Sequence, residues 1–154
     1  MKNKFFFILA ACVMLFVFSN LTFAQEKCAE ENSIKRVSKS RSGNFEYVTF
    51  DVGSEAPEYA VTNAKRPFQR YAEEKILRIK GNYFKSIVFR GVYWTCVIGQ
   101  NLKAATTQIM DVKNIEQFEG QVEYIIGYRA RSKYVGVSMT GTGSNRHVVL
   151  KFKR

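Results

Sequence analysis

Apolar and polar residues alternate in short runs along most of the chain beyond residue 44. Within Gln121–Gly127, the apolar residues Val122, Tyr124 and Ile126 occupy every second position, which is the period of a half-buried strand. The same period in Phe45–Val52 predicts three residues that face the core: Val48, Phe50 and Val52.

Further strands are expected where β-branched and aromatic residues gather between turn signals, over Tyr59–Thr62, Lys75–Lys80, Lys85–Arg90, Val92–Ile98, Gln108–Ile115, Tyr134–Met139 and Val148–Phe152. Gly141–Asn145 provides residues that tolerate positive φ in a hairpin turn. A short helical turn is expected at Pro67–Glu74. The pattern predicts an all-β fold, an antiparallel β-sandwich or partly open barrel of about seven to nine short strands.

The N-terminus has the layout of a signal peptide. Lys2 and Lys4 precede the apolar run Phe5–Phe18, and Thr22 and Ala24 supply the small residues of a cleavage site. The uninterrupted apolar run is shorter than the roughly 20 residues of a permanent transmembrane helix. We therefore expect residues 1–24 to be removed and the protein to be exported, to the periplasm or beyond the cell.

An alternative is lipoprotein anchoring, because Leu9–Cys12 matches a bacterial lipobox. Against it, Cys12 lies early and is followed by more apolar residues in place of a polar tether. After the signal segment, residues 25–43 are polar and are expected to form a leader. Residues 44–154 are then long enough for a single β domain.

Basic residues outnumber acidic ones, at 24 Lys and Arg against 13 Asp and Glu, which gives a formal charge of +11. Removal of Lys2 and Lys4 with the signal segment lowers this charge to +9. No acidic residue follows Glu123, whereas the turn after it contains Arg129, Arg131 and Lys133. Such a positive end attracts anionic surfaces. The competing interpretation is that these are solvated turn residues of an ordinary basic secreted protein.

Two cysteines, Cys28 and Cys96, remain after the signal segment. An even pair in an oxidising compartment is a candidate disulfide. The alternative is a free, buried Cys96 within an apolar strand and an unpaired Cys28 in the leader.

Catalytic and metal chemistry find little support in the sequence. The single histidine, His147, lies in or beside the last strand, and no nucleophile-elbow motif surrounds a serine or cysteine. One histidine and two distant cysteines do not supply four zinc ligands. Glycoside hydrolysis needs two carboxylates on opposite sides of the scissile bond, and nothing in the sequence places Glu116 and Glu119 in that way. Glu119 is better suited to hydrogen bonding with the backbone of the turn. We expect no enzymatic activity, no metal and no cofactor.

Aromatic residues leave two further options. Tyr93 and Trp94 are adjacent and could line a sugar-binding face, although packing in the core is the commoner use of such residues. Basic turns beside Tyr128 would also allow stacking on nucleic acid, but an exported protein is not expected to have that partner.

One family resemblance spans about residues 44–152. Phe118-Glu119-Gly120, an apolar strand ending in Gly127-Tyr128, a basic turn, a second strand and the terminal His147–Phe152 are similar to the AMIN-like domain. Upstream, Asn44–Val52 and Pro57–Val61 resemble the first two strands of that family. The resemblance implies a secreted all-β module of the cell envelope, since related AMIN domains locate peptidoglycan amidases on the cell wall.

The sequence thus predicts a non-catalytic envelope module that binds peptidoglycan or another anionic polymer. From charge alone, we assign the contact to Arg129, Arg131 and Lys133, together with Tyr128. Two alternatives stay open: a barrel that holds a small apolar ligand, and a module that adds a strand to a partner's sheet.

Overall fold

A computed structural model gives the structure of residues 32–54, 56–70, 75–96, 102 and 106–154. These described residues all lie within one compact unit, Glu31–Arg154. The predicted signal segment, residues 1–24, lies outside the described part of the chain, as do Cys12 and Cys28. Export and N-terminal processing therefore stay predictions.

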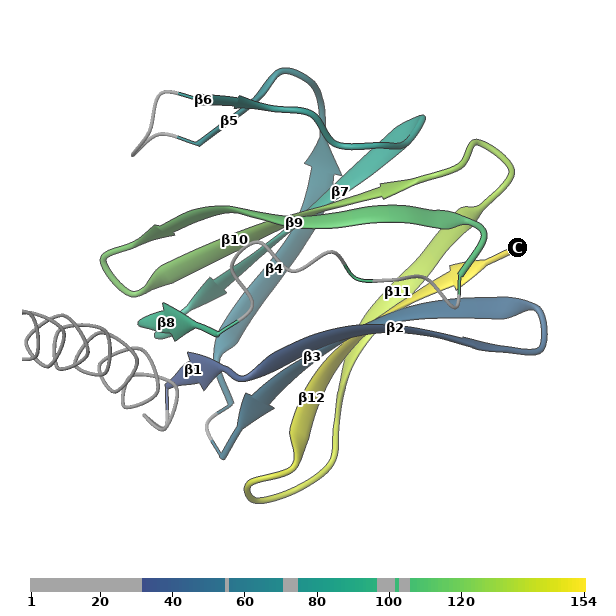
Figure 1. Ribbon diagram of the computed structural model, residues 1–154. Helices are drawn as coiled ribbons and strands as arrows, with labels where there is room; N and C mark the ends of the chain where they lie inside the picture. The colour runs from purple at the N-terminus through teal and green to yellow at the C-terminus, as the bar shows by residue number, and fades with distance from the viewer. Residues whose placement is uncertain (1–31, 55, 71–74, 97–101, 103–105) are drawn as a thin grey trace, which may run out of the picture. The chain divides into compact units, whose positions relative to one another are not determined.

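The first large sheet has four antiparallel strands in the order β4-β7-β10-β9 (Figure 1). They are β4 (Glu58–Ala64), β7 (Tyr83–Arg90), β10 (Gln121–Tyr128) and β9 (Ile109–Phe118). Strands β9 and β10 form a hairpin whose turn residues, Glu119 and Gly120, have φ values of 46° and 74°. Positive φ at both positions is type I′ geometry, which matches the right-handed twist of the two strands.

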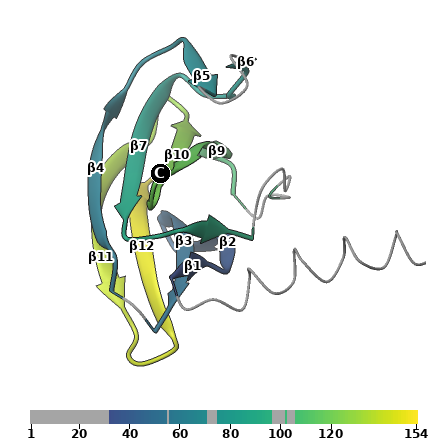
Figure 2. The ribbon, with the colours of Figure 1, turned by 90° about the vertical axis from the view of Figure 1, so that its left-hand side faces the viewer.

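The second large sheet is also antiparallel, in the order β11-β12-β3-β2. Its strands are β11 (Lys133–Thr140), β12 (Arg146–Lys153), β3 (Phe45–Gly53) and β2 (Arg36–Ser42). Figures 1 and 2 show the two sheets as facing layers, with β9 and β10 opposite β2 and β3. The fold is an antiparallel β-sandwich, which confirms the predicted all-β class.

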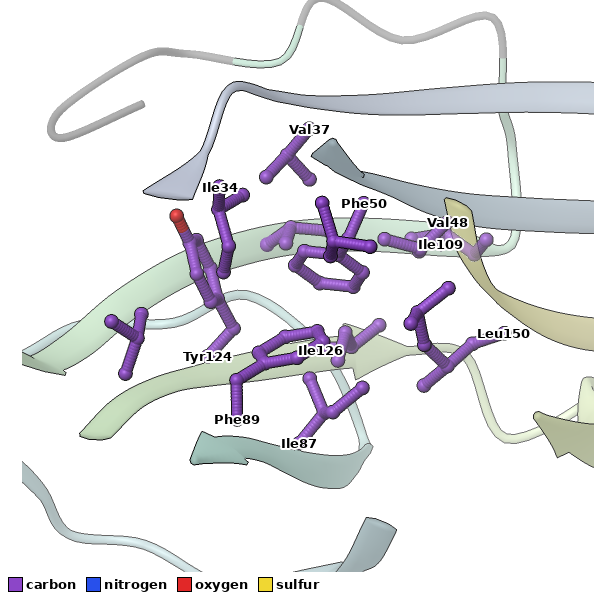
Figure 3. Close-up of a cluster of buried hydrophobic side chains, with 14 of the residues drawn as sticks. Ile34, Val37, Val48, Phe50, Ile87, Phe89, Ile109, Tyr124, Ile126 and Leu150 are labelled. Atoms are coloured by element: carbon purple, nitrogen blue, oxygen red, sulfur yellow. The ribbon is translucent and has the colours of Figure 1, made fainter. Parts of the chain in front are cut away.

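The main core fills the space between these sheets. The Phe50 ring lies 5.1 Å from that of Phe89 and 5.0 Å from that of Tyr124, measured between centroids. All three residues are at most 2% exposed. Figure 3 shows Phe50 extending from one layer towards Phe89 and Tyr124 in the other, with Val48 beside Ile109. The predicted core residues Val48, Phe50 and Val52 are confirmed, at 0%, 0% and 2% exposure.

Tyr124 is the polar member of this core. Its hydroxyl shares a hydrogen bond with the hydroxyl of Thr95, which is also buried. Burial raises the pKa of Tyr124 to about 12, although the bond to Thr95 acts in the opposite direction. The tyrosine therefore stays neutral at physiological pH. Its buried hydroxyl is satisfied by the hydrogen bond with Thr95.

Four strands of two or three residues complete the fold. The parallel pair consists of β1 (Ser33–Ile34) and β8 (Trp94–Thr95), and the antiparallel hairpin consists of β5 (Phe68–Arg70) and β6 (Lys75–Leu77). The described part of the chain thus contains twelve strands. This is more than the seven to nine, approximately, that the pattern predicts. The excess comes from these short strands, which are too short to show a period.

A second hydrophobic cluster lies on the other side of the β10 sheet. It contains Phe68, Ile79, Phe84, Ile115 and Ile125. Ile125 is 1% exposed even though its neighbours Tyr124 and Ile126 face the main core. Strand β10 is therefore buried on both faces, because the region of the β5–β6 hairpin covers the outer one.

The predicted polar leader and helical turn are wrong. Strands β1 and β2 lie within residues 33–42, which were expected to belong to the leader, and Ile34 and Val37 are 0% and 2% exposed. The helical turn expected at Pro67–Glu74 is absent from the described residues of that range, where Phe68–Arg70 is strand β5. Residues 71–74 lie outside the described part of the chain.

One buried carboxylate joins the two sheets. Glu46 is 0% exposed on the inner face of β3. Its Oε1 accepts hydrogen bonds from the Thr107 amide at 2.9 Å and the Thr107 hydroxyl at 3.1 Å. Its Oε2 accepts from the amides of Gln108 at 2.8 Å and Ile109 at 2.9 Å. Arg154 Nε lies 3.7 Å from Oε1. Both carboxylate oxygens are therefore satisfied by the segment that begins β9.

These bonds determine the charge state of the carboxyl group. Burial alone would raise the pKa of Glu46, but hydrogen bonds from Thr107, Ile109 and Gln108 outweigh it. The net pKa lies below its ordinary value. Glu46 is thus ionised in the folded protein at neutral pH.

A close backbone approach fixes the segment that follows β6. A Cβ added at Gly127 would lie 2.0 Å from the carbonyl oxygen of Lys80, and one added at Gly81 would lie 2.8 Å from the Gly127 Cα. Gly81 has a φ of 147°. Glycine is therefore required at both positions, because two backbones meet with no room for a side chain.

We expect Glu46→Gln to lower the free energy of unfolding by about 3 kcal/mol at pH 7, because the amide group would face N–H donors. A depressed folded-state pKa means that this stabilisation is present above the unfolded value of about 4.3 and is lost as pH falls through the folded value. The difference between wild type and variant should therefore shrink below about pH 4. Urea unfolding across a pH series measures it.

Glu58→Gln is the matched control, because the ion pair of Glu58 with Arg90 has side chains 71% and 52% exposed. That substitution should barely move the midpoint. A Glu46→Gln difference that stays constant down to pH 3 would contradict the assigned charge state.

Gly127→Ala should destabilise the protein by about 3 kcal/mol, because its Cβ cannot fit without moving backbone. Gly136→Ala is the control: it also lies in a strand, and an added Cβ there meets nothing within 4 Å. Urea midpoints of the two variants compare them. Equal midpoints would show that the Gly81–Gly127 contact does not constrain the fold.

Candidate functional site

The predicted basic turn connects β10 to β11. Arg129, Arg131 and Lys133 are all exposed there. The backbone of the turn is held in place, because the Arg129 amide donates to the Gln108 carbonyl at 3.0 Å and the Ser132 hydroxyl donates to the Lys153 carbonyl at 2.8 Å. The turn therefore presents its cations from a fixed backbone.

Tyr128 does not join these cations at the surface. It is 8% exposed, and its ring centroid lies 5.1 Å from that of Phe152 and 6.0 Å from that of Tyr83. Burial raises the pKa of the Tyr128 hydroxyl. The ring therefore packs in the core and does not share the exposed surface of the three cations, so its position gives no support to the polymer contact assigned to Tyr128.

The structure brings a different set of residues to the same end of the sandwich. On β3, Val48 and Phe50 face the core, so Phe45 and Tyr47 point outward. In the sheet register, Lys153 stands directly opposite Phe45, and Lys151 directly opposite Tyr47. We call Phe45, Tyr47, Lys133, Lys151 and Lys153 the lysine–aromatic face.

Contacts within this face are close. Lys151 Nζ lies 3.8 Å from the centroid of the Phe45 ring, which is a cation–π contact. Lys133 pairs with Lys153 across β11 and β12, so a row of lysines runs beside the two rings. Phe45, Tyr47 and Lys151 are half-buried, whereas Lys133 and Lys153 are exposed.

Negative charge is scarce in this sheet. The sequences of its four strands contain two carboxylates, Glu46 and Asp51. Glu46 faces the core, and Asp51 pairs with His147 and Arg36 near the other end of β3. The end that carries Phe45 is therefore positive, with the lysines uncompensated by any acid from these strands.

Tyr93 and the Phe118-Glu119-Gly120 turn come together although they are distant in sequence. The Val92 amide donates to the Gly120 carbonyl at 3.1 Å, and a Cβ at Gly120 would lie 3.3 Å from the Tyr93 ring. Tyr93 is 62% exposed and Phe118 is 64% exposed. Trp94 is half-buried in β8, and a sugar-binding face that it shares with Tyr93 stays a prediction.

Cys96 and His147 are the residues that nucleophilic chemistry would need. Cys96 is disulfide-bonded, so it offers no thiol. Its expected partner, Cys28, lies outside the described residues, and the Cys28–Cys96 pairing stays a prediction. His147 lies in β12, and its buried Nδ1 has no hydrogen-bond partner in the described part of the chain.

In the described part of the chain, no cluster of three or more His, Cys, Asp and Glu side chains is arranged to hold a metal ion. The same residues contain no helix of the length and apolarity needed to cross a bilayer.

A cleft of about 830 Å³ lies beside the β5–β6 hairpin. It extends from this hairpin over Met110 and Asp111 of the edge strand β9 to Lys39 of the edge strand β2. No sequence pattern indicates this cleft, because its lining comes from five separate segments of the chain.

Comparison with known proteins adds no relative. No protein-family model matches this chain, and no curated protein matches it. The AMIN-like resemblance accordingly rests on the sequence motifs alone.

Proposed function

We propose that this protein, once exported, is a non-catalytic module that binds an anionic polymer of the cell envelope, with peptidoglycan as the favoured ligand. The observation that carries the proposal is the lysine–aromatic face on β3, β11 and β12. It combines the two chemistries that such a polymer requires on a surface that a long chain can reach.

The first chemistry is stacking. The flat rings of Phe45 and Tyr47 project from one side of a single strand, and the apolar faces of sugar rings pack against aromatic rings. The second is charge. Lys133, Lys151 and Lys153 would attract the peptide carboxylates that peptidoglycan carries, and the attraction acts over about one Debye length of 8 Å at physiological salt.

The basic turn extends the same surface. Arg131 lies two residues before Lys133, and both are exposed. Arg129 and Arg131 thus keep the role that charge alone suggests, as contacts for the polymer, while Phe45 and Tyr47 take the aromatic role first assigned to Tyr128. The AMIN-like resemblance supports the same class of ligand, and the signal-like N-terminus supports the same compartment.

Strand addition is the alternative that an open edge would favour. β11 is an edge strand with a single charged residue, Lys133, and Val135 is 52% exposed. However, the register of β11 shifts between Tyr134 and Gly136. A bulge of this kind twists an edge and blunts it against pairing. A polymer contact on the outer face therefore explains more of the surface.

Co-sedimentation of the exported protein with purified peptidoglycan sacculi tests the proposal. Lys151→Glu/Lys153→Glu should weaken pelleting by about tenfold at low salt, because two attractive charges become repulsive. Tyr47→Ala should weaken it by several-fold and should leave the salt dependence unchanged, because it removes stacking and no charge. Binding of the wild type should fall as salt rises.

Lys65→Glu/Lys75→Glu is the control for the charge change, because both lysines are exposed and lie outside the lysine–aromatic face. It should pellet nearly as well as wild type. Arg129→Glu/Arg131→Glu measures the contribution of the basic turn separately. Absence of pelleting at low salt, or an equal loss in the control, would overturn the proposal.

A further inference from the structure

The cleft beside the β5–β6 hairpin is built firmly. Arg66 Nη2 donates to the Ile79 carbonyl at 2.6 Å, and the Arg66 guanidinium lies 4.7 Å from the centroid of the Phe84 ring. Lys113 Nζ donates to the Arg78 carbonyl at 2.8 Å. Together with the Gly81–Gly127 contact, these bonds fix the segment that follows β6. The cleft wall is therefore preformed.

One part of the cleft is apolar. Its lining includes Phe68, Ile76, Leu77, Ile79, Leu102 and Met110. Ile76 is 66% exposed, and Leu77 is half-buried. Exposure of an isoleucine beside other apolar side chains is unfavourable, because its apolar surface contacts water. A ligand that covered this surface would gain free energy of binding.

The other part is cationic. Lys39, Arg66, Arg78, Lys80 and Lys113 line the cleft, and Asp111 is the acid that faces them. Asp111 is already occupied: Oδ2 accepts from the Lys80 amide at 3.1 Å, and Oδ1 accepts from the Val112 amide at 3.1 Å. Five cations against one engaged carboxylate leave the cleft strongly positive.

Lys39 is the most informative of these cations. It pairs in register with Val48, whose side chain is 0% exposed, so Lys39 projects from the core-facing side of β2. Its ammonium makes no hydrogen bond or ion pair with the residues that the structure describes, although Asp111 and Glu46 act on it at longer range. Desolvation by burial lowers the pKa of Lys39, against the effect of those two acids.

An inward lysine on an edge strand has a structural explanation, since it discourages pairing with other chains. That explanation does not account for the apolar wall opposite it, nor for the exposed Ile76. A ligand with an anionic head and an apolar tail satisfies both features. The volume of 830 Å³ also falls within the range of about 300–1,000 Å³ for small-molecule sites.

We propose that this cleft binds a single-chain fatty carboxylate, with the carboxylate at Lys39 and the acyl chain against Ile76, Leu77 and Phe68. This goes beyond the polymer-binding proposal and does not depend on it, because none of these residues belongs to the lysine–aromatic face. The ligand is held by charge at one end and by apolar burial along the other.

Isothermal titration of the exported protein with decanoate tests the proposal, with 1-decanol as the uncharged chain and acetate as the head alone. We expect one-to-one binding of decanoate, with at least about tenfold weaker binding of 1-decanol and no saturable binding of acetate. Decanol that binds as tightly as decanoate, or decanoate that binds at many equivalent sites, would overturn it.

Lys39→Met should weaken the binding of decanoate at least about tenfold and change the affinity for 1-decanol by no more than about twofold. The substitution keeps an apolar side chain of similar length at position 39 and removes the ammonium charge. Ile76→Ser should weaken both by about threefold. The exposed position of Ile76 makes this second variant safe for folding, so it decides the matter if Lys39→Met proves unstable.

Lys75→Met is the matched control, because Lys75 lies in β6 beside Ile76 but does not line the cleft. A loss equal to that of Lys39→Met would reject the assigned head position. Lys151→Glu/Lys153→Glu should keep its affinity for decanoate, and Lys39→Met should still pellet with sacculi. Failure of one proposal is therefore distinguishable from failure of the other.

Discussion

The ionised carboxylate of Glu46 is the interaction on which the arrangement of the two sheets depends. Strand β3 carries it at the centre of one sheet, and its four hydrogen-bond donors lie in Thr107, Gln108 and Ile109, where the other sheet's edge strand begins. Apolar contacts such as Phe50 with Tyr124 hold the layers together without directing them. A buried, fully bonded charge is directional, and leaving it unpaired is costly. It therefore fixes which part of β9 faces β3.

How far the sequence predicts this fold depends on strand length and on burial. Strands β3 and β10 alternate clearly, because one of their faces is covered by the main core. Strand β2 lies at a sheet edge and has one fully buried side chain, Val37, so its sequence reads as a polar leader. Glu46 is hidden for a related reason. It has the right phase for the core, but only the folded chain brings its donors, about sixty residues away, to meet it.

The candidate site shows the same division. Clustering along the chain was enough to single out Arg129, Arg131 and Lys133, because they are neighbours in sequence. The alternation of β3 also placed Phe45 and Tyr47 away from the core. Their combination with Lys151 and Lys153 could not be predicted from the sequence, since about a hundred residues separate the two strands. Only the register of β3 with β12 brings these residues together. Tyr128 continues the core-facing phase of Val122, Tyr124 and Ile126, so the strand period already favours its packing against Phe152 over a place beside the exposed cations.

The uses of the cations follow from the same geometry. Arg66 and Lys113 donate to backbone carbonyls that hold the segment after β6, and Arg90 pairs with Glu58 at the surface. Lys39 has no such task, although it lies where both Glu46 and Asp111 influence its charge. Glu46 keeps β3 against the start of β9, and β2 is bonded to β3, so the same carboxylate sets how far Lys39 stands from the β9 wall of the cleft. An anionic ligand that paired with Lys39 would therefore enter a cleft whose width the Glu46 carboxylate already maintains.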